Sequence, residues 1–329
     1  MKKHYNGRNK SAISKLAVGA GLLFWFSVTL FLSQVAKINL DNRNYVAGSM
    51  IIPHIKNSIQ KPAPIIYEGK IVIIIDDIGR EMESLQRLSK LQLPFTISIL
   101  PYLKYSREAA IFAHQNGWEV MMHVPMEPLN YPEKNPGTNA LMSYMSQDEL
   151  QEKFIDIYTK IPYVKGFNNH MGSLFTTLPH KMQYIMKIAS MKDIYFIDSK
   201  TTHRSSALRV AIENNVSASE RTLFIDSVIN EEIIIENLLN LFKTARERSF
   251  AIAICHAYPE TLNALSKLAP LLAENNQHLV HASEVVYSIE NKAYVNALYL
   301  QEQNKHKKAK AESDSLLLSK IDIPGEKIK

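Results

Sequence analysis

Cysteine is almost absent from this chain. Its 329 residues include one cysteine, Cys255, so no disulfide can form within the chain. Because many exported proteins also lack disulfides, this scarcity does not decide the compartment. Cys255 lies inside an apolar run, and we expect it to pack there as a small buried side chain.

Several common functional signatures are missing as well. The chain contains no HExxH zinc motif, no GxSxG nucleophile elbow and no P-loop for phosphates. It also lacks a concentrated basic region in its middle. The 38 basic and 32 acidic residues give a net charge of +6, and the basic surplus sits mainly at the two ends of the chain. We therefore expect no nucleic-acid partner.

The longest apolar run lies close to the N-terminus, from Ile13 to Val35. About 20 such residues span a bilayer core as a helix. The basic residues that precede the run favour the cytoplasm, which places the rest of the chain outside it. A cleaved signal peptide is the alternative, but the run is long and residues 33–36 form a poor cleavage site. We expect an inner-membrane anchor over residues 1–36 and a periplasmic domain.

The remaining chain divides by composition. Residues 37–67 contain prolines without a sustained period and are expected to form a linker, and residues 294–329 read as a polar, disordered tail. Between them, residues 68–293 alternate short apolar runs with amphipathic stretches, which is typical of β/α units around a buried parallel sheet. The expected strands are 70–75, 95–100, 119–123, 164–167, 194–197, 215–219, 250–255 and 278–281. The expected helices are 82–91, 106–116, 147–160, 181–191, 231–248 and 259–272. This pattern predicts a distorted (β/α) barrel of about seven to eight parallel strands.

Polar residues stand at the ends of five expected strands. They are Asp76-Asp77, His123, Asn168-Asn169-His170, Asp198-Ser199 and His256. A lone Asp at such a place usually caps a helix or a turn, and a lone His is usually structural. The carboxyl ends of barrel strands, however, converge on one rim, so these side chains are expected to lie together. A carboxylate with two imidazoles is a common ligand set for a hydrolytic zinc or a related divalent ion, and the second carboxylate of the pair can handle a proton.

Five segments carry a family resemblance. The apolar run before Asp76-Asp77 and the strings GWEVMMHVPMEP, GFNNHMGS, YFIDSKT and AIAICHAYPET resemble the divergent polysaccharide deacetylase family, in matching order over roughly residues 68–290. Members are bacterial envelope proteins with a distorted β/α barrel related to the sugar N-deacetylases. The resemblance implies that Asp77, His123 and His170 bind a divalent metal, expected to be zinc. It also implies that Asp76 is a catalytic base and His256 a catalytic acid.

The chain departs from the ordinary sugar deacetylases at two places. Glu127 stands where they carry a second histidine of an H-x-x-x-H step, and Asn168-Asn169-His170 stands where they carry an Arg-Pro-Tyr type motif. Glu127 could be a ligand, a partner of a ligating histidine or a rim carboxylate, and we favour the partner. Asn169 is expected to support the metal ligands or contact substrate. Asp198 is expected to assist catalysis by orienting an imidazole.

The leading hypothesis is a metal-dependent hydrolase that removes acetyl groups from an envelope carbohydrate, such as peptidoglycan or an exported polysaccharide. One alternative is a metal-containing carbohydrate-binding protein without turnover. Another is an envelope assembly factor.

Overall fold

The structure is a computed structural model, and it describes residues 69–274 and 278–287. The expected anchor (1–36), linker (37–67) and tail (294–329) lie outside the described residues. Within the described part of the chain, no helix combines the length and the apolar character that crossing a membrane requires.

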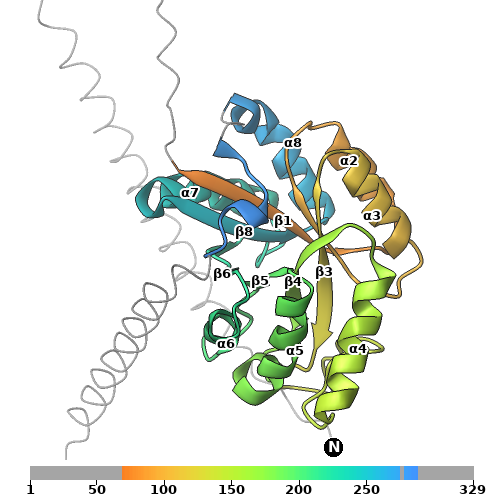
Figure 1. Ribbon diagram of the computed structural model, residues 1–329. Coiled ribbons are helices and arrows are strands. Elements are labelled where there is room, and N and C mark those ends of the chain that lie inside the picture. The colour runs from red at the N-terminus through yellow and green to blue at the C-terminus, as the bar shows by residue number, and fades with distance from the viewer. Residues whose placement is uncertain (1–68, 275–277, 288–329) are drawn as a thin grey trace, which may run out of the picture. The chain divides into compact units, whose positions relative to one another are not determined.

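Eight strands form one sheet in the order β6-β5-β4-β3-β2-β1-β8-β7, and neighbouring strands pair in parallel. The strands are β1 (Lys70–Ile78), β2 (Thr96–Ile99), β3 (Glu119–Met126), β4 (Val164–Met171), β5 (Tyr195–Asp198), β6 (Ala218–Glu220), β7 (Leu223–Phe224) and β8 (Phe250–His256). The helices are α2 (Glu83–Ser89), α3 (Ser106–Gln115), α4 (Gln147–Lys160), α5 (Pro179–Met191), α6 (Ala207–Glu213), α7 (Glu231–Arg248) and α8 (Pro259–Glu274). Figure 1 shows these helices arranged around the outside of the strands.

The sheet curls so that its two edge strands come together. The edges are β6 and β7, yet only Arg221 and Thr222 separate them along the chain. Three extended steps between Cα atoms cover about 11 Å. The stretch pairs first with β5 and then with β8, so it closes most of the gap between them. The expected barrel is therefore present as a curled parallel sheet, and no pairing between β6 and β7 seals the seam within the described residues.

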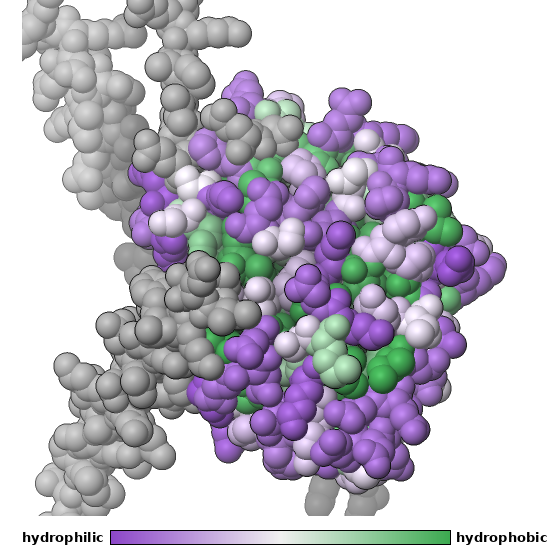
Figure 2. Space-filling view, in the orientation of Figure 1, coloured by the Kyte–Doolittle hydropathy of each residue, from purple (hydrophilic) through white to green (hydrophobic). Residues whose placement is uncertain are grey.

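Both faces of the sheet are buried, which explains the continuous apolar runs of the sequence. Side chains along a strand point alternately to opposite faces. On β1, Ile71, Ile73 and Ile75 pack toward the helices, while Val72 and Ile74 pack inside the curled sheet. The inner group continues with Met121, Tyr195, Ile197, Ile252 and Ile254. The outer surface in Figure 2 is mainly hydrophilic with scattered apolar patches.

The expected strand at 278–281 is wrong. Leu279 meets β1 through a single bridge to Ile71. The chain then turns into a short 3-10 helix, Ala282–Glu284, whose backbone N–H groups bond inside the curled sheet: Ala282 N donates to Thr96 Oγ1 and Ser283 N to Glu119 Oε1. Because these donors serve polar groups at the amino ends of β2 and β3, the segment caps the sheet. The short elements α6 and β7 were not predicted from the sequence.

Most strands run further than the sequence indicated. β1 extends to Ile78, β3 to Met126 and β4 to Met171. Most of the polar residues expected just after the strands therefore lie within the last residues of the strands themselves. Except at Asp77, their directions follow the strand alternation, which decides which of them face the interior of the curled sheet.

Candidate metal centre and active site

Three side chains converge at the carboxyl ends of β1, β3 and β4. Asp77 Oδ1 lies 2.9 Å from His170 Nδ1 and 3.1 Å from His123 Nε2. The two imidazole nitrogens lie 3.2 Å apart. These are the three residues that the sequence reasoning assigned to one ion, and the fold brings one ligand atom of each within 4.8 Å of the others.

Asp77 reaches this point because the backbone of β1 is irregular. Its pairing with β2 shifts register between Ile75 and Ile78, and Asp77 adopts a left-handed conformation with φ 62°. A regular strand would send neighbouring side chains to opposite faces, yet Asp76 and Asp77 both approach His123. A left-handed conformation is uncommon outside glycine, and Asp adopts it more readily than most other residues. Unusual backbone conformations of this kind cluster at functional sites, where they position a side chain.

The atoms fit a bound cation better than a set of hydrogen bonds. Asp77 Oδ1 is buried and has no hydrogen bond of acceptable geometry, although two imidazole nitrogens lie close by. Bonds of about 2.0–2.1 Å to a shared ion would place ligand atoms roughly 3 Å apart. A carboxylate and two imidazoles also leave positions open for water and substrate. The trio therefore suits zinc or a related divalent ion.

Asn168 organises the groups behind the trio. Its Nδ2 donates to both oxygens of Asp76, at 2.9 and 3.2 Å. Its Oδ1 lies 2.7 Å from His123 Nδ1 and also accepts from Ser98 Oγ. No role for Asn168 was predicted from the sequence. Its spacing from His170 was an available signal, because residues two apart on a strand share a face.

The close charges shift the pKa values of the metal-free site. Burial raises the pKa of Asp76, although His123 and His256 act against it. Burial also opposes ionisation of Asp77, but the contacts with His123 and His170 outweigh it and lower the pKa of that carboxyl. Burial would lower the pKa of His123, yet the two aspartates raise it to about 9. Without a metal, His123 is therefore charged at neutral pH.

His256 faces the same centre from β8. Its Nε2 lies 3.6 Å from Asp77 Oδ2, and its Nδ1 lies 3.2 Å from Asp226 Oδ1. Asp226 also accepts from the backbone N of His256 and from Thr261 Oγ1. The pKa of His256 is raised, because the bond and charge of Asp226 outweigh the effect of burial. No role was predicted for Asp226 from the sequence, although the string LFID that ends in it repeats the YFID pattern that ends in Asp198.

Asp198 does not orient an imidazole as expected, and Asn169 makes its hydrogen bonds to the backbone. Asp198 Oδ2 accepts from Ser205 Oγ at 2.6 Å, and its Oδ1 accepts from Lys200 N at 2.8 Å. The carboxylate that forms a hydrogen bond with the imidazole of His256 belongs to Asp226 and not to Asp198. Asn169 braces the backbone by donating to Met171 O and accepting from Ser199 N. Both residues share a strand face with side chains that pack toward the helices, so both point away from the interior.

Comparison with known proteins decides the family. The family model described as divergent polysaccharide deacetylase matches residues 73–286. The chain belongs to this family. The Escherichia coli protein YibQ, which is uncharacterised, is 33% identical over 201 residues, and the match covers 61% of this chain and 62% of YibQ. An uncharacterised Haemophilus influenzae protein is 28% identical over 198 residues, which cover 60% of this chain and 70% of that protein.

A solved structure shares the fold of this family member. The crystal structure of the uncharacterised Agrobacterium tumefaciens protein ATU2773 has a TM-score of 0.62 and 20% sequence identity. The similarity covers 68% of this chain and 92% of that one. At this identity the likeness concerns the fold alone.

Glu127 has another task in this deacetylase-family chain. Ser143 N donates to its Oε2 at 2.5 Å, and its backbone oxygen accepts from Leu174 N and Phe175 N. It is not among the residues that converge on the metal position within the described chain. Glu127 thus ties the long loop between β3 and α4 to the start of the loop after β4. The expectation of a hydrogen bond to a ligating histidine is not met.

Proposed function

We propose that the protein is a metal-dependent hydrolase that removes acetyl groups from an acetylated envelope glycan by cleaving a C–N or ester bond. The observation that carries the proposal is the convergence of Asp77, His123 and His170, with Asp76 and His256 beside them. The family supports the same class of reaction.

Asp77, His123 and His170 would hold the metal. A bound divalent ion, zinc by the character of these donors, supplies Lewis acidity that polarises a carbonyl and makes water more acidic. Asn168 supports this set, since it accepts from Nδ1 of His123 and so directs the lone pair of Nε2 toward the other ligands.

Asp76 and His256 would divide the proton transfers. Asp76 has a raised pKa, so its carboxylate is a stronger base than an exposed aspartate and can accept a proton from the attacking water. His256 also has a raised pKa, so it keeps its proton at higher pH and can donate it to the departing amine or alcohol. Asp226 holds the His256 ring in place through Nδ1, which leaves Nε2 toward the centre.

One observation favours a second candidate, a glycan-binding protein without turnover. Asp76 is only 3% exposed, and both of its oxygens accept from the Asn168 amide. A base held in this way has less freedom to take a proton from water. A binding protein would keep the metal and the glycan while releasing no acetate.

The test is acetate release by the zinc-loaded full chain from acetylated chito-oligosaccharides and acetylated peptidoglycan fragments. Release that requires zinc and His256 is the expected result. Glycan binding without acetate release from any of these substrates would reject the enzyme and favour the binding protein.

We also propose that residues 1–36 anchor the protein in the inner membrane with the domain in the periplasm. The apolar run from Ile13 to Val35 and the basic residues before it support this placement.

A further inference from the structure

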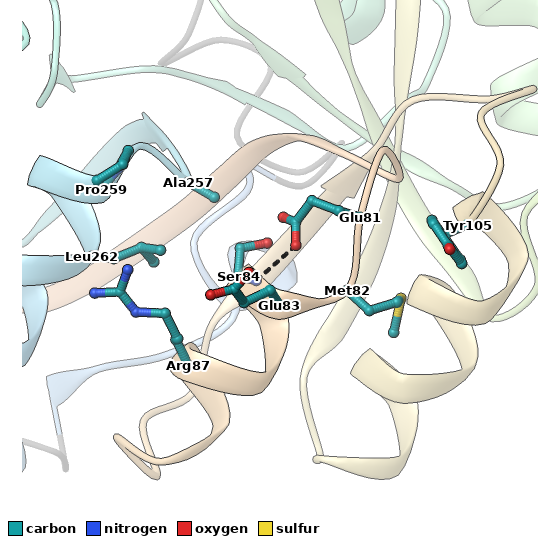
Figure 3. Close-up of a pocket in the computed structure, with 9 residues that line it drawn as sticks. All are labelled: Glu81, Met82, Glu83, Ser84, Arg87, Tyr105, Ala257, Pro259 and Leu262. Carbon is teal, nitrogen blue, oxygen red and sulfur yellow. Dashed lines mark hydrogen bonds between the residues drawn. The ribbon is translucent and has the colours of Figure 1, made fainter.

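A pocket of about 400 Å³ opens between the loop that follows β1 and the loop that follows β8 (Figure 3). Its polar walls come from Glu81, Glu83, Ser84 and Arg87, and its apolar walls include Ala257 and Leu262. None of these residues belongs to the metal trio. Ala257 directly follows His256 in the chain, so the pocket lies at the same carboxyl end of β8 as the proposed proton donor.

The pocket presents negative charge to a ligand. Glu81 and Glu83 are both exposed. Arg87, the guanidinium among the lining residues, donates from Nη2 to Asn263 Oδ1 at 3.0 Å and so ties α2 to α8. Glu81 Oε2 already accepts from Ser84 N, but the two carboxylates still outnumber the one guanidinium, so the lining carries a net negative charge. Such a lining accepts hydrogen bonds from hydroxyl or ammonium groups and repels acid groups.

Ser84 points independently to a missing partner. The residue is 4% exposed, and its Oγ is buried without a hydrogen-bond partner among the described residues. Its backbone N is satisfied, because it donates to Glu81 Oε2 at 3.1 Å (Figure 3). Buried hydroxyl groups are nearly always paired, so a lone one beside a polar pocket indicates a partner from outside the chain.

We propose that this pocket binds a sugar residue that carries no acid group, with an amine-bearing sugar preferred, adjacent in the glycan to the residue that loses its acetyl group. The inference rests on the proposed function for its place in the reaction. The leaving amine or alcohol belongs to the sugar and departs at His256, so the glycan chain extends toward this side of the centre. Glu81, Glu83 and Ser84 would bond the polar groups of the sugar, and Ala257 and Leu262 would contact its C–H face.

Calorimetric titration of the zinc-loaded full chain tests the pocket. The first probe is the trimer of glucosamine with free amines, which cannot be deacetylated further, and the second is trigalacturonic acid. Binding of the first and not the second is expected. The variants Glu83→Gln and Ser84→Ala should each weaken trimer binding about 3–10-fold, the typical effect of one hydrogen bond. Ser84→Ala should not lower the melting temperature, because the hydroxyl has no bond within the chain to lose.

The matched control is Glu108→Gln. Glu108 is also an exposed glutamate in the first turn of a helix, α3, but it does not line the pocket. Its variant should bind the trimer as the wild type does. The proposal is overturned if the wild type does not bind the trimer, if both probes bind equally, or if the two pocket variants bind like the control. Acetate release from the N-acetylated trimer is measured separately. Pocket-dependent binding without acetate release would reject the proposed function and leave the pocket standing.

Discussion

Asn168 Oδ1 lies 2.7 Å from His123 Nδ1, and this contact determines which imidazole nitrogen is available to a metal. The other end of the Asn168 amide donates to Asp76, so the oxygen must face His123. An amide oxygen only accepts, which requires a proton on Nδ1 of the ring. When the ring is neutral, the lone pair of His123 is therefore on Nε2, the atom that approaches Asp77.

Replacing Asn168 should weaken metal binding without abolishing it. Asn168→Ala removes the acceptor that orients His123, and losses of this kind cost about 10–100-fold in metal affinity. Competition titrations with a zinc chelator measure the effect. Asn169→Ala is the control, since Asn169 is equally buried but braces the backbone away from the trio. The Asn169→Ala variant should have a lower melting temperature than the wild type, but its zinc affinity should change less than that of Asn168→Ala. Equal affinity in the Asn168 variant and the wild type would remove Asn168 from the metal centre.

Each member of the trio should be required for the metal. Asp77→Ala, His123→Ala and His170→Ala should lose most bound zinc, because each removes one of three ligand atoms. Glu127→Ala should retain zinc, since Glu127 bonds to the backbone of Ser143 instead. Elemental analysis measures the zinc bound by each variant, and circular dichroism shows whether the variant is folded. A full equivalent of zinc in His170→Ala would exclude the proposed site.

Zinc binding should release protons at neutral pH. In the metal-free protein the two aspartates raise the pKa of His123 to about 9, so the ring is charged at pH 7 and must lose a proton before it can bind zinc. Apparent affinity should therefore rise with pH, by about tenfold per unit for one displaced proton, and level off near pH 9. Calorimetry in two buffers of different ionisation enthalpy counts the protons. Zinc binding to the Asp76→Asn variant should release fewer protons at pH 7, because the variant lacks one of the two carboxylates that raise the pKa of His123. Zinc binding without proton release at pH 7 would contradict this.

His256 should matter for turnover and not for metal binding. His256→Ala should keep zinc and glycan, while acetate release falls by roughly 10²–10⁴-fold, the usual cost of losing a general acid. Asp226→Asn should move the high-pH loss of activity to lower pH, because Asp226 raises the pKa of the group that must stay protonated. The pH dependence of kcat/KM measures this loss of activity at high pH. If the loss occurs at the same pH in Asp226→Asn as in the wild type, another group donates the proton. If His256→Ala loses zinc, His256 is a metal ligand.

A reporter fusion tests the topology. A periplasm-dependent reporter fused after Leu300 should be active, because the basic residues before Ile13 hold the N-terminus in the cytoplasm. Activity of a cytoplasm-dependent reporter at the same position would reject the placement. A mature N-terminus near Lys37 would replace the anchor by a cleaved signal peptide.

Much of the scaffold could be predicted because it depends on local pattern. Helices α4 and α7 begin and end at the expected residues, and each begins after a capping side chain, Ser146 or Asn230. The apolar runs of β1 and β8 were recognisable because a parallel sheet buries both of its faces. The strand-end positions of Asp77, His123 and His170 were likewise visible in the sequence.

The sequence by itself thus determined the class of fold, the family and the three residues of the candidate metal site. Only the tertiary structure decided which carboxylate meets His256, because Asp226 and His256 are 30 positions apart and meet through the pairing of β7 with β8. The left-handed turn at Asp77 and the seam between β6 and β7 were equally hidden. Alternation along a strand is local and can be read from the chain. Register shifts and sheet curvature arise from distant strands packing together, and no short stretch of sequence contains that information.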